Sequence, residues 1–180
     1  RPSRSPQVRR PMRPLHHRDP GAIGALMEDR RVSVELIADG IHVHPAVLRL
    51  VRNEAGNHRI VLITDAMGAA GAPDGRYMLG ELEVDVVDGV ARLVDGGAIA
   101  GSTLTLDWAL RFIVLQGGIP LEHAVEMLST NAARTLGLED RGSIAPGKRA
   151  DLIVLGPRLE VEAVMTRGDW VIGSGVQSGS

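Results

Sequence analysis

LITDAMGAAG, residues 62–71, is the most informative segment of this sequence. It continues an apolar run, IVLI at 60–63, whose length and composition are typical of a strand covered on both faces in a parallel sheet. The run gives way to Asp65 and then to a loop rich in glycine and alanine. Aspartate is common where strands turn, but catalytic groups also lie at the C-terminal ends of barrel strands. On this stretch alone, both interpretations of Asp65 stay open.

The residues before this stretch complete a strand–helix–strand unit. VSVELIA at 32–38 predicts a buried strand that stops at the pair Asp39-Gly40. A helix is expected from Pro45 to about Asn53, with the proline in its first turn. Because a strand, a crossover helix and a second strand normally form a parallel pair, we expect the carboxyl ends of the two strands to meet at one edge.

The residues after it predict a hairpin and two helices. ELEVDVVDGVARLV at 81–94 alternates apolar and acidic residues, and its Asp-Gly pair at 88–89 suits a type I′ turn. An almost wholly apolar helix is expected at about 103–116, well buried and with Ser102 as its N-cap. A second helix is expected from Pro120 to a stop at Gly137. Three short strands follow, at 150–155, 161–168 and 170–172.

Composition narrows the class of protein. The chain has 180 residues, 44% of them hydrophobic, a formal charge of −2 and no cysteine. The near-neutral charge argues against nucleic acid as a partner, and the lack of cysteine excludes a disulfide framework and a thiolate metal site. No apolar run has the length of a membrane span and no signal-peptide pattern is evident, so we expect no membrane partner and a cytoplasmic protein. The first 14 residues, rich in Arg and Pro, show no strand or helix period.

Three segments end in side chains that could carry chemistry: Arg18 in HHRDPG, His42 in ADGIHVHP, and Asp65. The last two directly follow the predicted parallel strands, so both could project from one rim. His44 stands two residues after His42 and makes an HVH pair like the metal-binding pair of amidohydrolases. Pro45 follows at once, and that pair belongs on a first strand, so the sequence disfavours a metal there.

Six motifs together give a specific resemblance. They are MRPLHHRDPG, IADGIHVHP, LITDAMGAAG, AIAGSTLTLD, STNAARTLGL and GSIAPGKRADLIVL. From about Met12 to Ile172 the chain resembles the C-terminal half of the N-acetylglucosamine-6-phosphate deacetylase family, within the amidohydrolase superfamily. The resemblance implies an α/β fold, the C-terminal portion of a (β/α)8 TIM-type barrel with part of a small β-sandwich domain. The implied organisation is an irregular segment at 1–14, barrel at 15–77 and 98–140, a hairpin insertion at 78–97, a β-module at 141–173 and a polar tail at 174–180.

The same resemblance implies an activity and roles for single residues. The reaction is hydrolysis of N-acetylglucosamine 6-phosphate to glucosamine 6-phosphate and acetate. Asp65 would be the general base, and His42 would polarise the acetyl group. Arg18 would bind the 6-phosphate, in the family homodimer at its own or the neighbouring subunit's site. Further pocket residues would be Asp39, Gly40, Ile41, Ile99, Ala100 and Gly101.

One part of the family pattern is absent. The family's ligands for a divalent metal, zinc or a similar ion, lie on earlier strands, the last just before an Asn-Ala-Met turn. Here Arg10 and Pro11 stand before Met12. We therefore expect this chain to hold no catalytic metal tightly and to be inactive alone, as a truncated or frame-shifted reading would be. The alternatives are another amidohydrolase, similar to dihydroorotases or hydantoinases, and a non-catalytic remnant or interaction module.

Overall fold

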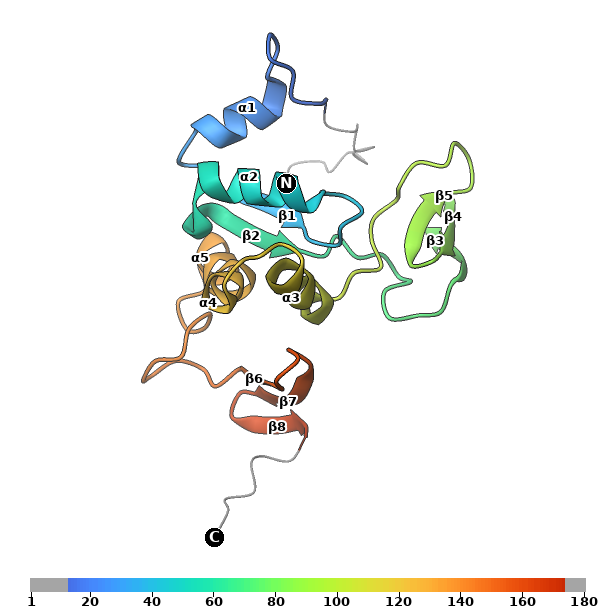
Figure 1. Cartoon of the computed structure of the whole chain (residues 1–180). Helices are drawn as coiled ribbons and strands as arrows, with labels where there is room; N and C mark the ends of the chain where they lie inside the picture. The colour runs from blue at the N-terminus through green and yellow to red at the C-terminus, as the bar shows by residue number, and fades with distance from the viewer. Residues whose placement is uncertain (1–12, 174–180) are drawn as a thin grey trace, which may run out of the picture.

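The structure is a computed structural model that describes residues 13–173. The polar tail, and all but the last two residues of the irregular first segment, lie outside this range. None of the described helices is long and apolar enough to cross a membrane. The helices are α1 Gly21–Glu28, α2 Pro45–Ala55, α3 Leu106–Leu115, α4 Leu121–Val125 and α5 Asn131–Thr135, with short turns at Asn57–Arg59 and Glu126–Thr130. The strands are β1 Val34–Ile37, β2 Ile60–Ile63, β3 Gly75–Leu79, β4 Leu82–Val87, β5 Val90–Leu93, β6 Leu152–Leu155, β7 Val161–Thr166 and β8 Asp169–Ile172. Along the described chain, helices and strands alternate as far as β2; the strands β3 to β5, the helices α3 to α5 and the strands β6 to β8 then follow in that order (Figure 1).

Strands β1 and β2 form the predicted parallel pair, in register from Val34 opposite Ile60 to Ile37 opposite Ile63. Helix α2 connects them and begins at Pro45, as expected. The His44 side chain caps this helix by accepting from the backbone N–H of Ala46. The apolar face of α2 and one side of both strands join the larger core, which also takes residues from α3 and α4. Loops 38–44 and 64–72 therefore leave the sheet at the same edge.

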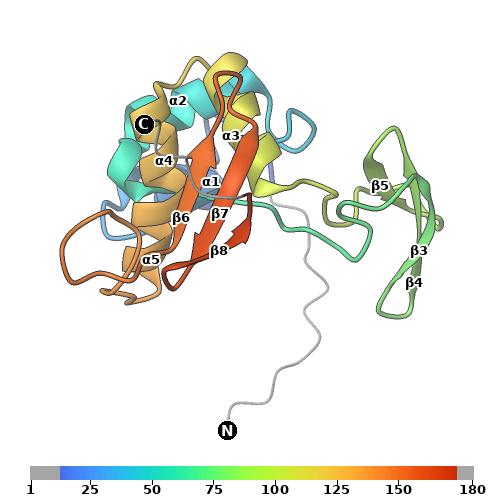
Figure 2. The same ribbon diagram turned by 90° about the horizontal axis from the view of Figure 1, so that it is seen from below.

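The predicted hairpin is present but is part of a three-stranded antiparallel sheet, β3–β4–β5. Asp88 and Gly89 both have positive φ, 51° and 71°, as a type I′ turn requires. The added strand β3 begins at Gly75, three residues before the boundary at 78 that was predicted for the insertion. Its sequence, GRYML, lacks a clear alternation and pairs because β4 lies beside it. Figures 1 and 2 show this sheet to one side of the helices.

Helix α3 differs from its prediction in two ways. It begins after Thr105, and Ser102 is not its N-cap. Nor is it well buried: Trp108 is 44% exposed and Leu115 is 65% exposed, while Ala109, Leu110 and Ile113 face the core. Uniform hydrophobicity predicts burial on all sides, but here the helix packs along one face only.

The second predicted helix runs from Leu121 to Thr135 and contains a π-helical turn at Glu126–Thr130. The extra residue in this turn shifts the buried positions, so Met127 and Asn131 are fully buried and Val125 is 43% exposed. The three closing strands form the sheet β6–β7–β8, which lies below the helices in Figure 1, and Leu155 of β6 packs against the larger core.

Candidate functional site

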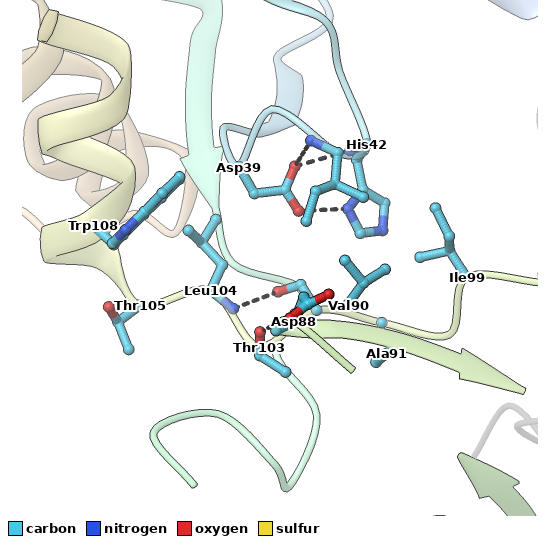
Figure 3. A pocket seen from close by; sticks show the side chains of 14 residues that line it. Asp39, His42, Asp88, Val90, Ala91, Ile99, Thr103, Leu104, Thr105 and Trp108 are labelled. Atoms are coloured by element: carbon cyan, nitrogen blue, oxygen red, sulfur yellow. Dashed lines mark hydrogen bonds and ion pairs between the residues drawn. The ribbon is translucent and has the colours of Figure 1, made fainter. Parts of the chain in front are cut away.

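A pocket of about 260 Å³ lies beside the carboxyl end of β1. The loop after β1 forms one wall, and the insertion and the segment that precedes α3 form the others (Figure 3). Five of the nine site residues predicted from the sequence line it: Asp39, Ile41, His42, Ile99 and Gly101.

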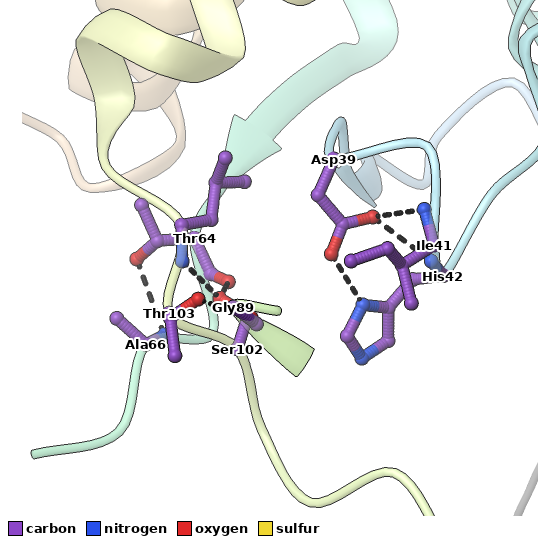
Figure 4. Close-up of polar contacts among 9 residues, drawn as sticks. Asp39, Ile41, His42, Thr64, Ala66, Gly89, Ser102 and Thr103 are labelled. Atoms are coloured by element: carbon purple, nitrogen blue, oxygen red, sulfur yellow. Dashed lines mark hydrogen bonds and ion pairs between the residues drawn. The ribbon is translucent and has the colours of Figure 1, made fainter. Parts of the chain in front are cut away.

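Asp39 and His42 form a tightly bonded pair. Strand β1 ends at Ile37, and the Asp39 carboxylate then folds back on its own loop, accepting the backbone N–H groups of Ile41 at 2.9 Å and His42 at 2.8 Å. Its second oxygen lies 2.7 Å from Nδ1 of His42 (Figure 4). Because an ionised carboxylate only accepts, Nδ1 carries the hydrogen. Asp39 therefore fixes the orientation of the imidazole and leaves Nε2 for another partner.

Gly40 does not line the pocket but allows this loop to pack. Its φ is +76°, and a Cβ there would lie 2.8 Å from the Phe112 ring. Phe112 stacks on Trp108, with ring centroids 5.3 Å apart, and Trp108 lies at the pocket. A glycine at position 40 thus brings the Asp39–His42 loop against α3.

Asp107 lies in the first turn of α3, next to the pocket residue Trp108, and its pKa is shifted. Burial acts to raise the pKa of Asp107, but hydrogen bonds from Thr105 and Arg111 outweigh it and hold that pKa below its ordinary value. The carboxylate accepts from the Arg111 guanidinium at 2.8 Å. The lowered pKa favours the ionised form of Asp107, and its ion pair with Arg111 stabilises the first turn of α3.

Asp65 is half-buried two residues after β2 and has a φ of +48°, which is uncommon for a residue other than glycine. Its carbonyl accepts the backbone N–H of Ser102 at 2.9 Å. The Ser102 hydroxyl donates to the Thr64 carbonyl and accepts the backbone N–H of Leu104. Ser102 thus joins the end of β2 to the segment before α3, and Asp65 adjoins the pocket wall without lining it.

Residues 99–101 divide between the pocket and the insertion. Ile99 and Gly101 line the pocket, whereas Ala100 is buried in the second core and donates its N–H to Ala91. Gly101 has a φ of +68°, and a Cβ would lie 3.1 Å from the Asp65 carbonyl oxygen. The backbone donor of Ala100 is therefore committed within the protein.

Arg18 is not at this pocket. It lies on the exposed loop before α1, where Asp19 pairs with Arg13 at 3.4 Å. Among residues 13–173 no ion pair of the Arg18 guanidinium is found. The structure thus brings together the residues after β1 and those before α3, and leaves the predicted phosphate ligand apart.

Sequence reasoning missed nine pocket residues. They come from the insertion and from the segment that leads into α3: Asp88, Gly89, Val90, Ala91, Ser102, Thr103, Leu104, Thr105 and Trp108. The hairpin turn was recognised only as a turn. Thr103 stands in the motif AIAGSTLTLD, so proximity to the predicted residues 99–101 was an available signal. Trp108 had none, because an aromatic residue in an apolar helix predicts core.

Residues 14–171 match the profile of the amidohydrolase family. The chain belongs to the amidohydrolase family. Relatives of this amidohydrolase carry related names. A putative N-acetylgalactosamine-6-phosphate deacetylase of Escherichia coli K12 is 49% identical over 155 residues, which are 86% of this chain and 92% of that protein. The N-acetylglucosamine-6-phosphate deacetylase of Vibrio furnissii is 43% identical over 87% of this chain, but the match is only 39% of its own length.

A solved structure agrees. The amidohydrolase superposes with a TM-score of 0.86 and 48% identity on the N-acetyl-D-glucosamine-6-phosphate deacetylase of Mycobacterium smegmatis, covering 89% of this chain and 43% of that one. That structure is an aspartate-to-alanine mutant in complex with N-acetyl-D-glucosamine-6-phosphate. This amidohydrolase therefore spans about two fifths of the length of the Vibrio and Mycobacterium enzymes and shares their barrel-type fold over that part.

Members of this family generally depend on a divalent metal. In the part of the chain that the structure describes, no group of three His, Asp or Glu side chains is placed to hold an ion. A catalytic zinc normally takes about three protein ligands. Residues 13–173 alone therefore do not fit a catalytic metal.

Proposed function

We propose that this chain carries the substrate-binding and proton-transfer residues of a deacetylase that hydrolyses N-acetylglucosamine 6-phosphate to glucosamine 6-phosphate and acetate. The observation that carries the proposal is the Asp39–His42 pair, fixed at the carboxyl end of β1 and lining a pocket. Support comes from 48% identity to an enzyme crystallised with that sugar phosphate. In this proposal β1 and β2 belong to an eight-stranded barrel, and β6 to β8 belong to a small β-sandwich.

His42 would act on the acetyl group. With Nδ1 bonded to Asp39, Nε2 is the ring atom left to contact the acetyl oxygen. An acetyl oxygen bonded there gains most when negative charge develops on it, after water attacks the carbonyl carbon. His42 would thus stabilise the tetrahedral intermediate.

Asp65 would move the proton. A general base takes a proton from the attacking water and later delivers it to the amine that leaves, so that acetate and a free amino sugar form. The positive φ of Asp65 is consistent with this role, because uncommon backbone conformations concentrate at functional sites. No step of this scheme is assigned to a metal, because residues 13–173 do not fit one.

Arg18 would bind the 6-phosphate through its guanidinium, which matches the geometry of an oxyanion. Because the loop that carries Arg18 is exposed and apart from the pocket, we assign this contact to the site of a second subunit in a homodimer. A charged sugar phosphate also makes the cytoplasm the proposed compartment.

A second candidate differs in one hydroxyl. The Escherichia coli relative at 49% identity is named for N-acetylgalactosamine 6-phosphate, the C4 epimer. Both candidates share the acetamido group and the phosphate, so they need the same His42, Asp65 and Arg18. The contacts to the ring hydroxyls decide between them.

A chimera tests the proposal. Residues 13–173 replace the matching part of the Mycobacterium smegmatis deacetylase, and acetate release is measured with each 6-phosphate epimer. We expect activity with one or both sugars, its loss in His42→Ala, and its retention in Thr166→Val, a change on the distant strand β7. A folded chimera that releases no acetate would contradict the proposal.

A further inference from the structure

The turn at Asp88-Gly89 forms one wall of the pocket, although it belongs to the insertion and not to the β1–β2 unit. We propose that Thr103 and Asp74 are positioning residues that hold this turn as a fixed wall of the sugar pocket. The inference rests on the proposed function, since it concerns the same pocket. The turn at Asp88-Gly89 lies outside the six motifs of the resemblance.

Thr103 links the turn to the segment before α3. Its hydroxyl donates to the Gly89 carbonyl at 2.5 Å (Figure 4). The residue before it, Ser102, is 4% exposed and is bonded to the end of β2 through its backbone and its hydroxyl. Ser102 fixes the backbone next to Thr103, and the Thr103 hydroxyl binds the turn. The turn is therefore held at a set position relative to the end of β2.

Asp74, from the loop after β2, holds the same turn through a second set of hydrogen bonds. Its carboxylate accepts the backbone N–H of Asp88 at 2.5 Å and that of Gly89 at 3.1 Å. Hydrogen bonds to a charged acceptor are stronger than neutral ones. The two N–H groups and the Gly89 carbonyl are thus all bonded to side chains from outside the turn.

The hydrogen bonds of Thr103 and Asp74 lie where the insertion contacts the rest of the site. Met67 and Ala69, from the loop after β2, pack in the second core with Val84, Val86 and Ala91 of the insertion. That apolar contact sets where the sheet lies, and the polar bonds of Thr103 and Asp74 set where its turn lies. The result is a wall that presents the Asp88 carboxylate, an acceptor for sugar hydroxyls, opposite the Asp39–His42 loop (Figure 3).

The test uses the 180-residue chain and N-acetylglucosamine 6-phosphate, with binding measured by titration calorimetry. Thr103→Val removes the hydroxyl at nearly constant shape, and we expect it to weaken binding by about 3- to 10-fold, the range for loss of one hydrogen bond. Thr103→Ser keeps the hydroxyl, so its affinity should lie within about 2-fold of the wild type. Thr166→Val makes the same chemical change on β7 and should leave affinity unchanged.

The Ser and Val variants separate the two roles of the side chain. If Thr103 only packed, Ser would weaken binding at least as much as Val, and that result would overturn the inference, as would wild-type affinity in Thr103→Val. Asp74→Ala removes the other set of hydrogen bonds to the turn and should also weaken binding, so this variant tests the inference if Thr103→Val does not fold. A wild-type chain that does not bind this sugar phosphate or its C4 epimer would contradict the proposed function and the inference together. Binding that no variant changes would contradict the inference alone.

Discussion

Replacing Gly40 by alanine should destabilise the loop that carries His42. The backbone at Gly40 has a φ of +76°, and a methyl group there would lie 2.8 Å from Cζ and 2.9 Å from Cε2 of Phe112. Phe112 cannot simply rotate away, because it stacks on Trp108 at 5.3 Å. The substitution therefore adds a backbone cost and a packing cost at one position.

The two costs can be estimated separately. A side chain in the left-handed region costs about 1–2 kcal/mol, and forcing an extra carbon into a packed contact costs about 1–3 kcal/mol. Together they predict a loss of about 2–5 kcal/mol, which for a chain of this length lowers Tm by roughly 4–20 °C. Restricting the unfolded chain offsets about 0.4–1 kcal/mol of this loss.

Gly71 is a matched control, because its φ is also +76° and no atom lies within 4 Å of a Cβ built there. Gly71→Ala should show the backbone cost and the unfolded-chain effect without the clash. Thermal and urea unfolding, followed by circular dichroism, should therefore find Gly40→Ala less stable than Gly71→Ala by about 1–3 kcal/mol. Phe112→Leu should reduce that difference in the double variant. Equal losses at the two glycines would refute the argument that Gly40 is required by Phe112.

Three further predictions concern the chemistry. In the chimera described above, Asp65→Asn should lower kcat by about 10²–10⁴-fold while KM changes little, because the amide cannot accept a proton; a near-normal kcat would return Asp65 to the role of a strand-end turn. Arg18→Ala should raise KM for the phosphorylated sugar by about 10- to 100-fold and have little effect on unphosphorylated N-acetylglucosamine, and equal effects on both sugars would exclude a phosphate contact. After dialysis, elemental analysis of the 180-residue chain should find well under one divalent ion per chain, whereas a stoichiometric ion at His42, His44 and Asp65 would restore the HVH pair as a metal site.

Local chemistry made much of the fold predictable from the sequence. Strand β2 is an uninterrupted apolar run, and α2 begins at a proline whose fixed φ suits a first helical turn. The turn at Asp88-Gly89 follows from two residues that tolerate positive φ. Each of these features is decided within a few residues, so a single sequence contains the necessary information.

The features that were missed depend on contacts between distant residues. Ser102 precedes an apolar run and so suggests an N-cap, but its hydroxyl bonds to Thr64, 38 residues earlier. Thr103 bonds to Gly89, which is 14 residues away. Strand β3 exists because β4 pairs with it. Hydropathy and residue spacing do not reveal such long-range partners. The wall of the pocket is built from these long-range contacts.

Asn131 shows how a motif outside the pocket still bears on the site. It lies in STNAARTLGL, one of the six motifs of the resemblance, and it is fully buried after the π-helical turn. Its amide donates to the carbonyls of Asn57 at 2.8 Å and Ile60 at 2.7 Å, and thus holds the start of β2. Ser102 holds the end of the same strand through Thr64 and Asp65. Side chains from later in the chain thus fix β2 at both ends, and one of them, Asn131, does not line the pocket. The position of the candidate base therefore depends on contacts that the apolar run of the strand does not reveal.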